Sequence, residues 1–199
     1  MLNGKPPPET TAARVSNRGT ITRISLTALF AALIAGGTFI AVPLPFSPVP
    51  IVLQNLFVVL AGLVLGPARG AAAAGLYLLA GALGLPVFAG AVGGAAHFLG
   101  PTGGFLAGYF FAALAAGLVA GAPKPGKPAP LFRLVLASVC GFLLVFVPGL
   151  LWLYRLTGSW AAAFAAGFFP FIAGDAVKAF IAVTAASRLR RVAADKLSG

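Results

Sequence analysis

Two ionisable side chains stand close together in an otherwise apolar stretch near the end of the chain. Asp175 is the only acidic residue between Glu9 and Asp195, and Lys178 follows it by three positions. Residues at i and i+3 share one face of a helix, so both side chains project to one place. Charges in apolar surroundings are costly and usually face a partner or a polar cavity. The pair therefore predicts either a binding site for a small polar solute or a structural pair that holds two helices together.

Further polar side chains could complete such a site. Gln54 and Asn55 begin an apolar segment that follows Pro50, and their amides could reach a ligand or cap a helix. His97 is the only histidine in the chain. It is expected either as a hydrogen-bonding, pH-sensitive latch of the pocket or, in the interpretation we favour, as an ordinary interfacial side chain.

Aromatic side chains are candidates for the apolar walls of a pocket. Tyr77, Phe88 and Tyr109 are the rings we single out, although packing explains most rings in a chain with 17 phenylalanines. Cys140 is the only cysteine and is expected to pack as a small apolar side chain. Without a Cys/His cluster, the sequence indicates no metal site and no cofactor.

The composition places these residues in a membrane. Of 199 residues, 60% are hydrophobic and 9% charged, and the mean hydropathy is +1.01, whereas a soluble domain carries about 25% charged residues. The net charge of +11 comes from clumps of basic residues between apolar runs, and residues 70 to 123 hold no charge at all. This spacing is typical of membrane loops and disfavours a nucleic-acid-binding face.

Six segments are apolar enough to cross a bilayer, which takes about 20 residues of helix. They are residues 24–42, 51–66, 70–84, 104–121, 132–153 and 171–188. With both termini in the cytoplasm, twelve of the 14 basic residues fall on the inner side, and an odd number of spans would break this partition. The sequence therefore predicts an all-α membrane protein, a six-helix bundle with both termini inside and with structured outer loops.

The chain is expected to have three parts: a disordered cytoplasmic terminus (1–20), a membrane domain (21–192) and a cytoplasmic tail (193–199). A cleaved signal peptide is disfavoured because the first apolar run is longer than 7 to 15 residues.

Two outer loops, 43–50 and 84–104, are long and rich in glycine and proline. Irregular backbone at membrane depth survives where it lines a cavity, so these loops either cap an outward-facing pocket or form tight turns. Pro170 favours a helix start, which predicts a separate interfacial helix over 159–169 and places Asp175 and Lys178 one to two turns below the outer face.

Two motif classes are rejected. Residues 121–128 begin like a phosphate-binding loop, but Pro128 replaces the Ser or Thr that binds magnesium, and two further prolines remove backbone N–H groups. No nucleophile motif such as G-x-S-x-G is present. We therefore expect no enzyme and no ATP hydrolysis by this chain alone.

The first apolar segment carries small residues at every fourth position, Ala28, Ala32 and Gly36. Small residues let helices approach closely in lipid. This stripe either packs inside the bundle or offers a docking face to another membrane protein.

Five signatures in order resemble the BioY family, whose members are biotin-binding substrate-capture (S) components of energy-coupling factor (ECF) transporters. They are Ser47–Gln54, Ala61–Gly70, Gly84–Gly90, Gly100–Phe105 and Gly174–Lys178, spread over about 130 residues. The resemblance implies a six-helix bundle in the bacterial inner membrane, an outward-facing pocket for biotin, and association with a membrane scaffold (T) subunit and two ATPase subunits.

The resemblance also suggests roles for individual residues. Asp175 and Lys178 match the acid and lysine that are thought to contact biotin in the family, and the Ala28, Ala32 and Gly36 stripe resembles the motif that docks on the scaffold subunit. Gln54, Tyr77 and Phe88 are expected to complete the substrate site.

Two features differ from the family pattern: the apolar loop 89–92, where some relatives have a polar contact, and His97. An S component for another vitamin, a self-sufficient carrier and an intramembrane enzyme are the alternatives.

Overall fold

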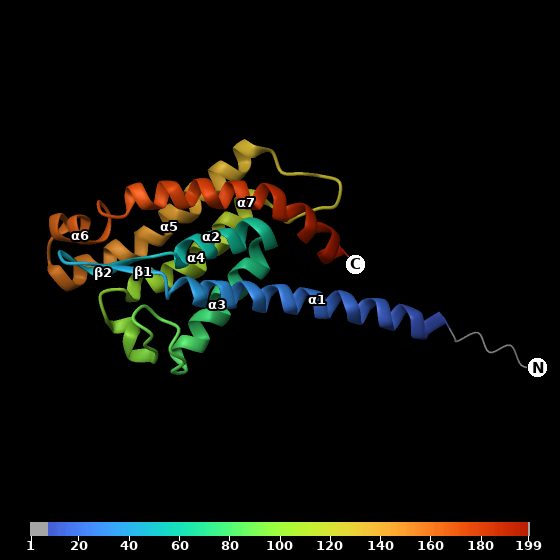
Figure 1. Ribbon diagram of the computed structural model, residues 1–199, viewed down its shortest axis with the longest axis horizontal. Coiled ribbons are helices and arrows are strands. Elements are labelled where there is room, and N and C mark those ends of the chain that lie inside the picture. The colour runs from blue at the N-terminus through green and yellow to red at the C-terminus, as the bar shows by residue number, and fades with distance from the viewer. Residues whose placement is uncertain (1–7, 199) are drawn as a thin grey trace, which may run out of the picture.

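The computed structural model describes residues 8–198 and shows a mostly helical bundle (Figure 1). The helices are α1 (Pro8–Gly37), α2 (Gln54–Leu65), α3 (Pro67–Ala82), α4 (Gly103–Ala120), α5 (Leu131–Thr157), α6 (Trp160–Gly167) and α7 (Ile172–Ser198), together with a short 3₁₀ helix, η1 (Ala95–Leu99). Two short strands, β1 (Ala41–Leu44) and β2 (Ser47–Val52), form a hairpin at one end.

Three helices of the described residues are long and apolar enough to cross a membrane: Gly19–Gly37 within α1, then α4 and α5. The pair α6 and α7 passes the same test as a fourth span that bends by 50° at residues 168–171. Helix α2 is apolar but has only 12 residues, which is about 18 Å of helix. Three helices of the described residues, or four with the bent pair, thus pass the test, whereas six spans were predicted. Helices α2 and α3 lie within a few residues of two predicted segments but are too short to pass it.

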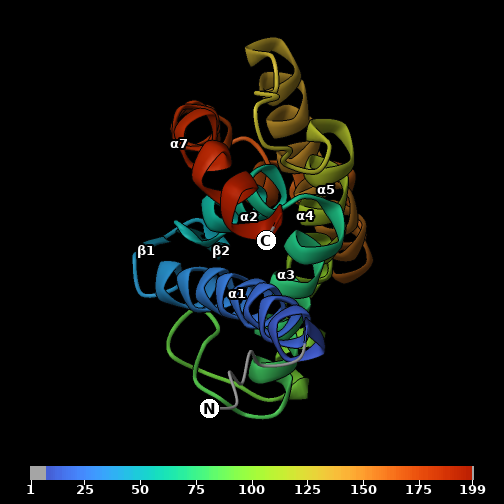
Figure 2. The same cartoon turned by 90° about the vertical axis from the view of Figure 1, so that its right-hand side faces the viewer.

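Helix α2 lies in the middle of the bundle, where α1, α3, α4 and α7 surround it, as the end-on view shows (Figure 2). Eleven of its 12 residues are buried. The close packing depends on small residues, because a Cβ at Gly62 would overlap the carbonyl group of Ala113, and one at Gly70 would overlap the backbone of Gly62. Without a hydrophobic force between helices in lipid, such contacts hold the bundle together.

The β-hairpin corrects the all-α prediction and the irregular loop expected over 43–50. Strands β1 and β2 are antiparallel, with Val42 opposite Ile51 and Leu44 opposite Ser47. The prolines of this segment hid the strands in the sequence, since proline cannot donate a ladder hydrogen bond. A two-stranded sheet tolerates them because each strand has an outer edge that needs no donor.

The N-terminal part of the chain also differs from expectation. Residues 1–7 lie outside the described part, but from Pro8 the backbone is helical, so residues 8–20 continue α1 although they were expected to be disordered. Helix α1 ends at Gly37, five residues before the predicted end of the first span, because the hairpin begins at Ala41. The separate helix predicted over 159–169 is present as α6, with Ser159 as its N-cap.

Candidate functional site

A cavity lies at the hairpin end of the bundle, between α2, α4, α5 and α7. The open space inside it is about 40 Å³, well below the range of about 300 to 1,000 Å³ for ligand pockets, so the described site is closed around its own side chains and a ligand has to widen it. Val49, Pro50 and Val52 of β2, together with Ala89 of the outer loop, line its side. The long outer loops therefore contribute to a pocket wall, which was one of the two roles expected for them.

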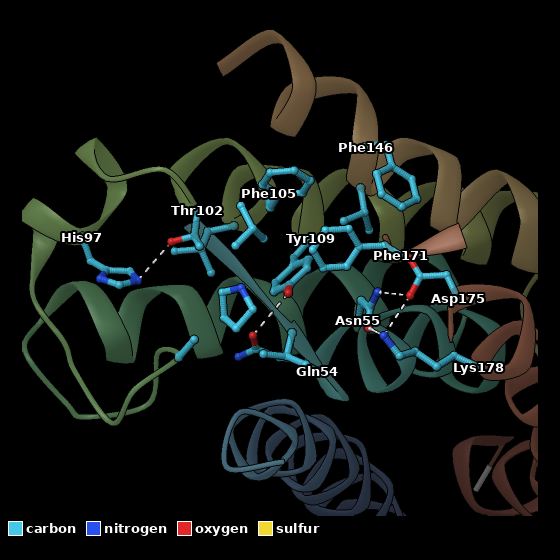
Figure 3. Close-up of a pocket in the computed structure, with 16 residues that line it drawn as sticks. Gln54, Asn55, His97, Thr102, Phe105, Tyr109, Phe146, Phe171, Asp175 and Lys178 are labelled. Carbon is cyan, nitrogen blue, oxygen red and sulfur yellow. Dashed lines mark hydrogen bonds and ion pairs between the residues drawn. The ribbon is translucent and has the colours of Figure 1, made fainter. Parts of the chain in front are cut away.

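A buried polar cluster closes one end of the cavity (Figure 3). Lys178 Nζ lies 2.8 Å from Asp175 Oδ1 in an ion pair, and both side chains are 7% exposed. Asn55 joins them: its Nδ2 donates to Asp175 Oδ1 at 2.9 Å, and its Oδ1 accepts from Lys178 Nζ at 3.0 Å. The predicted pair is thus present and lines a cavity. The third member of the cluster, Asn55, comes from 120 residues earlier in the sequence.

This cluster keeps unused hydrogen-bonding capacity. Both hydrogen bonds to the Asp175 carboxylate end on Oδ1, so Oδ2 has no partner among the described residues. Lys178 carries three N–H donors and uses two. One acceptor and one charged donor therefore remain at the edge of an apolar space, which suits a small solute with an N–H group or a carboxylate.

The cluster of Asn55, Asp175 and Lys178 lies where the N-terminal ends of α2 and α7 meet. Asn55 is the second residue of α2, and Asp175 lies in the first turn of α7, where its backbone N–H donates to Phe171 at 2.8 Å. The positive end of the helix dipole favours a carboxylate in a first turn. Lys178 comes one turn later on the same face. The two helices thus bring an amide, an acid and a cation to one point at the cavity wall.

Gln54 lines the cavity, but its side-chain amide is hydrogen-bonded to residues behind the cavity wall. Its Nε2 donates to the hydroxyl groups of Thr38 and Tyr77, and its Oε1 accepts from Tyr109 at 3.2 Å. Thr38 in turn donates to the carbonyl of Val87 at 2.8 Å. The network ties the end of α1, three helices and an outer loop to one residue of the cavity wall, and sequence reasoning missed Thr38.

Tyr77 and Phe88, which were expected to enclose the ligand, do not reach the cavity in this structure. Both are buried, and they pack against each other edge to face with ring centroids 5.7 Å apart. Phe88 occupies the space beside Gly81, where any Cβ would overlap its ring. Since Gly81 has no side chain, the Phe88 ring can pack against its backbone. Tyr77 and Phe88 therefore form a layer behind the cavity wall.

Four aromatic rings do line the cavity: Phe105, Tyr109, Phe146 and Phe171. Phe105 and Phe146 meet edge to face with centroids 6.4 Å apart. Of the four, sequence reasoning had singled out Tyr109 alone. Among 17 phenylalanines, nothing in the sequence marked the other three, since only the crossing of α4, α5 and α7 brings them together.

His97 lies at the end of the cavity opposite the charged cluster (Figure 3). Its Nε2 is 3.2 Å from Thr102 Oγ1, and its ring stacks on Phe88 with centroids 5.1 Å apart. Partial burial in this outer loop lowers the pKa of His97, which favours the neutral imidazole at neutral pH. His97 thus lines the pocket, and it also has an ordinary polar partner in Thr102, as the favoured interpretation expects.

A groove connects this end of the cavity with the outside of the bundle. It runs between the hairpin and the outer loop, and it shares four residues with the cavity: Pro50, Ala89, His97 and Thr102. These residues therefore stand between the cavity and the hairpin end of the molecule, where a solute would enter.

The small-residue stripe of α1 stays outside the bundle. Ala28, Ala32 and Gly36 are exposed, and a Cβ at Gly36 would meet no atom within 4 Å. Their neighbour Ala31 is buried instead. Of the two uses open to the stripe, packing within the bundle is thereby excluded for the described structure.

Comparison with known proteins gives consistent matches along the chain. A model of the BioY family matches residues 10–195. The probable biotin transporter BioY of Pyrococcus horikoshii is 45% identical over 84% of this chain and 95% of its own length, and the biotin transporter BioY of Thermotoga maritima is 38% identical with the same coverage. The crystal structure of an S-component for biotin from an ECF-type ABC transporter matches with a TM-score of 0.76 and 30% identity, over 86% of this chain and 92% of that one.

Proposed function

The chain belongs to the BioY family, and from this membership and the cavity we propose that it is a biotin-capturing membrane subunit, which takes biotin from outside and delivers it inward with an ECF energizing module. The observation that carries the proposal is the buried cluster of Asn55, Asp175 and Lys178, which presents one acceptor and one charged donor to an aromatic cavity.

The chemistry of biotin fits this arrangement. Biotin has a ureido ring with two N–H donors and a carbonyl acceptor, an apolar thioether ring, and a carboxylate tail. Asp175 Oδ2 can accept an N–H, and the third proton of Lys178 can bind either the ureido carbonyl or the carboxylate. Phe105 and Phe146 cover the apolar ring. Gln54 faces the ligand, whereas Tyr77 and Phe88 hold the wall from behind.

We place the subunit in the bacterial inner membrane as six spans, with both termini in the cytoplasm. The short helices α2 and α3 then count as two of the six spans, and the hairpin end faces outward. Twelve of the 14 basic residues fall on the inner side in this arrangement. The groove beside His97 opens outward, as a capture subunit requires. Residues 21–192 form the membrane domain and 193–199 a cytoplasmic tail.

We propose that a membrane scaffold subunit and two ATPase subunits complete the transporter. The exposed stripe of Ala28, Ala32 and Gly36 offers a smooth face on which a scaffold helix can pack closely. The chain itself lacks a usable phosphate-binding loop, because prolines occupy three of the eight positions from 121 to 128. Energy for transport therefore comes from its partners, and the chain is no enzyme and needs no cofactor.

Ligand retention by the purified protein tests the function. The protein is purified in detergent from cells grown with biotin, and its small molecules are identified by mass spectrometry. Labelled biotin is then competed with thiamine, riboflavin and biotin methyl ester. We expect biotin to co-purify and to bind in the nanomolar range, about −12 kcal/mol, with no competition from the other two vitamins.

Ligand retention and an uptake measurement together separate the alternatives. Tighter retention of another vitamin would make the chain an S component for that vitamin. Uptake into lipid vesicles by the chain alone would make it a self-sufficient carrier, and a chemically altered ligand would make it an enzyme. Biotin methyl ester reports the orientation of the ligand: weak binding places the carboxylate against Lys178, and unchanged binding places the ureido ring there.

A further inference from the structure

A second cavity lies at the opposite end of the bundle from the biotin site. It holds about 300 Å³ of open space between the loop that joins α4 to α5 and the C-terminal part of α7. Figure 1 shows this loop folding back beside the last turns of α7. Four cations line it, Lys124, Lys127, Arg190 and Arg191, against one acid, Asp195. Nothing in the capture of biotin uses this charge.

Arg190 forms the fixed floor of the cavity. It is 7% exposed, and its guanidinium donates to the carbonyls of Leu63, Ala120 and Gly121. Leu63 lies in the last turn of α2, and Ala120 ends α4, so these carbonyls have no partner within their own helices. The charge of Arg190 is therefore anchored beneath the cavity, while its donors are occupied by backbone.

The other three cations are available to a ligand. Lys124, Lys127 and Arg191 are exposed, and none of them has an ion pair or a side-chain hydrogen bond in the described part of the chain. Like charges gathered in one cavity repel each other, and an anion among them removes that repulsion. The cavity is thus complementary to an anionic group.

The surroundings indicate which anion. Leu131 and Phe132, in the first turn of α5, are 63% and 77% exposed, and Val192 on α7 is 59% exposed. Under the proposed topology, the cations therefore sit where this apolar surface ends, at the depth of phosphate headgroups. A nucleotide is disfavoured, because prolines at 123, 125 and 128 remove the N–H groups that cradle phosphates.

We propose that this cavity binds the phosphate headgroup of an anionic membrane lipid. Lys124, Lys127 and Arg191 contact the phosphate, Arg190 supports it electrostatically from the floor, and the acyl chains lie along the exposed apolar side chains of α5. Under the proposed topology this lipid belongs to the inner leaflet, whose anionic lipids attract basic segments near the membrane surface.

Native mass spectrometry of the detergent-purified protein tests the proposal. The protein is titrated with phosphatidylglycerol, with phosphatidylcholine, and with inorganic phosphate as a competitor. The variant Lys124→Gln/Lys127→Gln/Arg191→Gln removes the available cations. Its matched control, Arg69→Gln/Arg155→Gln/Arg188→Gln, removes the same charge from positions that do not line the cavity.

We expect phosphatidylglycerol to bind more tightly than phosphatidylcholine, and its affinity to fall at least about tenfold in the cavity variant but not in the control. Displacement by millimolar inorganic phosphate instead of persistence of the lipid would identify a free-phosphate site and overturn the lipid assignment. Equal retention of the two lipids, or of phosphatidylglycerol by both variants, would overturn it as well.

A protein partner is the remaining alternative. If the cavity variant keeps its lipid but no longer co-purifies with the energizing subunits, the cations form a protein interface and the lipid proposal fails. Thermal unfolding of each variant in detergent shows that it is folded, and because this readout needs no ligand, it keeps the test independent of the proposed function.

Discussion

The two ends of α7 bury charge in opposite ways. Near the start of the helix, Asp175 and Lys178 neutralise each other at 2.8 Å, with Asn55 bonded to both. Near its end, Arg190 has no carboxylate partner among the described residues and is held by backbone carbonyls, with further cations beside it. The first solution leaves a neutral polar wall that can receive a small ligand. The second leaves a surplus of positive charge, which is complementary to an anion.

The charge pair gives the largest expected effect. Either Asp175→Asn or Lys178→Met should lower biotin affinity about 100-fold or more, because each removes a proposed ligand contact and leaves the opposite charge buried and unpaired. The double variant removes both charges together. We expect it to unfold at a higher temperature than either single variant while still failing to retain biotin. Equilibrium binding and thermal unfolding in detergent measure the two effects.

The double variant also decides whether Asp175 and Lys178 bind the ligand or only hold two helices together. If it binds biotin as tightly as the unmodified protein, Asp175 and Lys178 only hold α7 against α2, and the ligand lies elsewhere in the cavity. Loss of binding with recovered stability separates a ligand site from a structural pair, which the single variants alone cannot do.

Arg190 should matter for stability and not for the ligand. Arg190→Met removes the donors of three buried carbonyls, and hydrogen bonds to a charged group contribute about 1.5 to 3 kcal/mol. For a chain of this size, a loss of about 3 kcal/mol lowers the midpoint of thermal unfolding by roughly 6 to 12 °C. The matched control, Arg191→Met, changes an exposed side chain and should shift it by about 1 °C.

Biotin affinity completes this comparison of the two ends. We expect Arg190→Met to bind biotin normally at temperatures where it is folded. A midpoint that falls equally in both arginine variants would mean that the general positive charge of this end, and not the carbonyl contacts of Arg190, affects stability.

The sequence could predict the charged residues of the site because they stand alone. Asp175 and Lys178 are isolated in an apolar run and share a helix face by their spacing, so no knowledge of neighbouring helices is needed. Asn55 completes their cluster from 120 residues away, and no local pattern reveals which helix start meets α7. The aromatic wall was hidden for the same reason, since it depends on how three helices cross.

Backbone details were predictable only where the chain follows a common pattern. Helix positions followed from hydropathy to within a few residues for α2 through α5. The hairpin did not, because its prolines argue against strands in general and are tolerated here only by an isolated pair of strands. Phe88 was expected at the ligand but packs beside Gly81, a contact between a loop and a helix that sequence spacing does not encode.

The uncharged stripe of α1 gives a third kind of surface and the smallest expected change within the chain itself. Ala32→Leu adds bulk to an exposed position, so folding and biotin affinity should stay unchanged, while co-purification with the scaffold subunit should fall about tenfold through lost close packing. Ala72→Leu, a matched change at an exposed alanine of α3, should leave assembly intact. Equal assembly of the two variants would remove the stripe from the docking surface. Weaker biotin binding in Ala32→Leu would instead show that α1 and the cavity are coupled. The hydrogen bond from Gln54 to Thr38, which follows α1, is the contact that would carry this coupling.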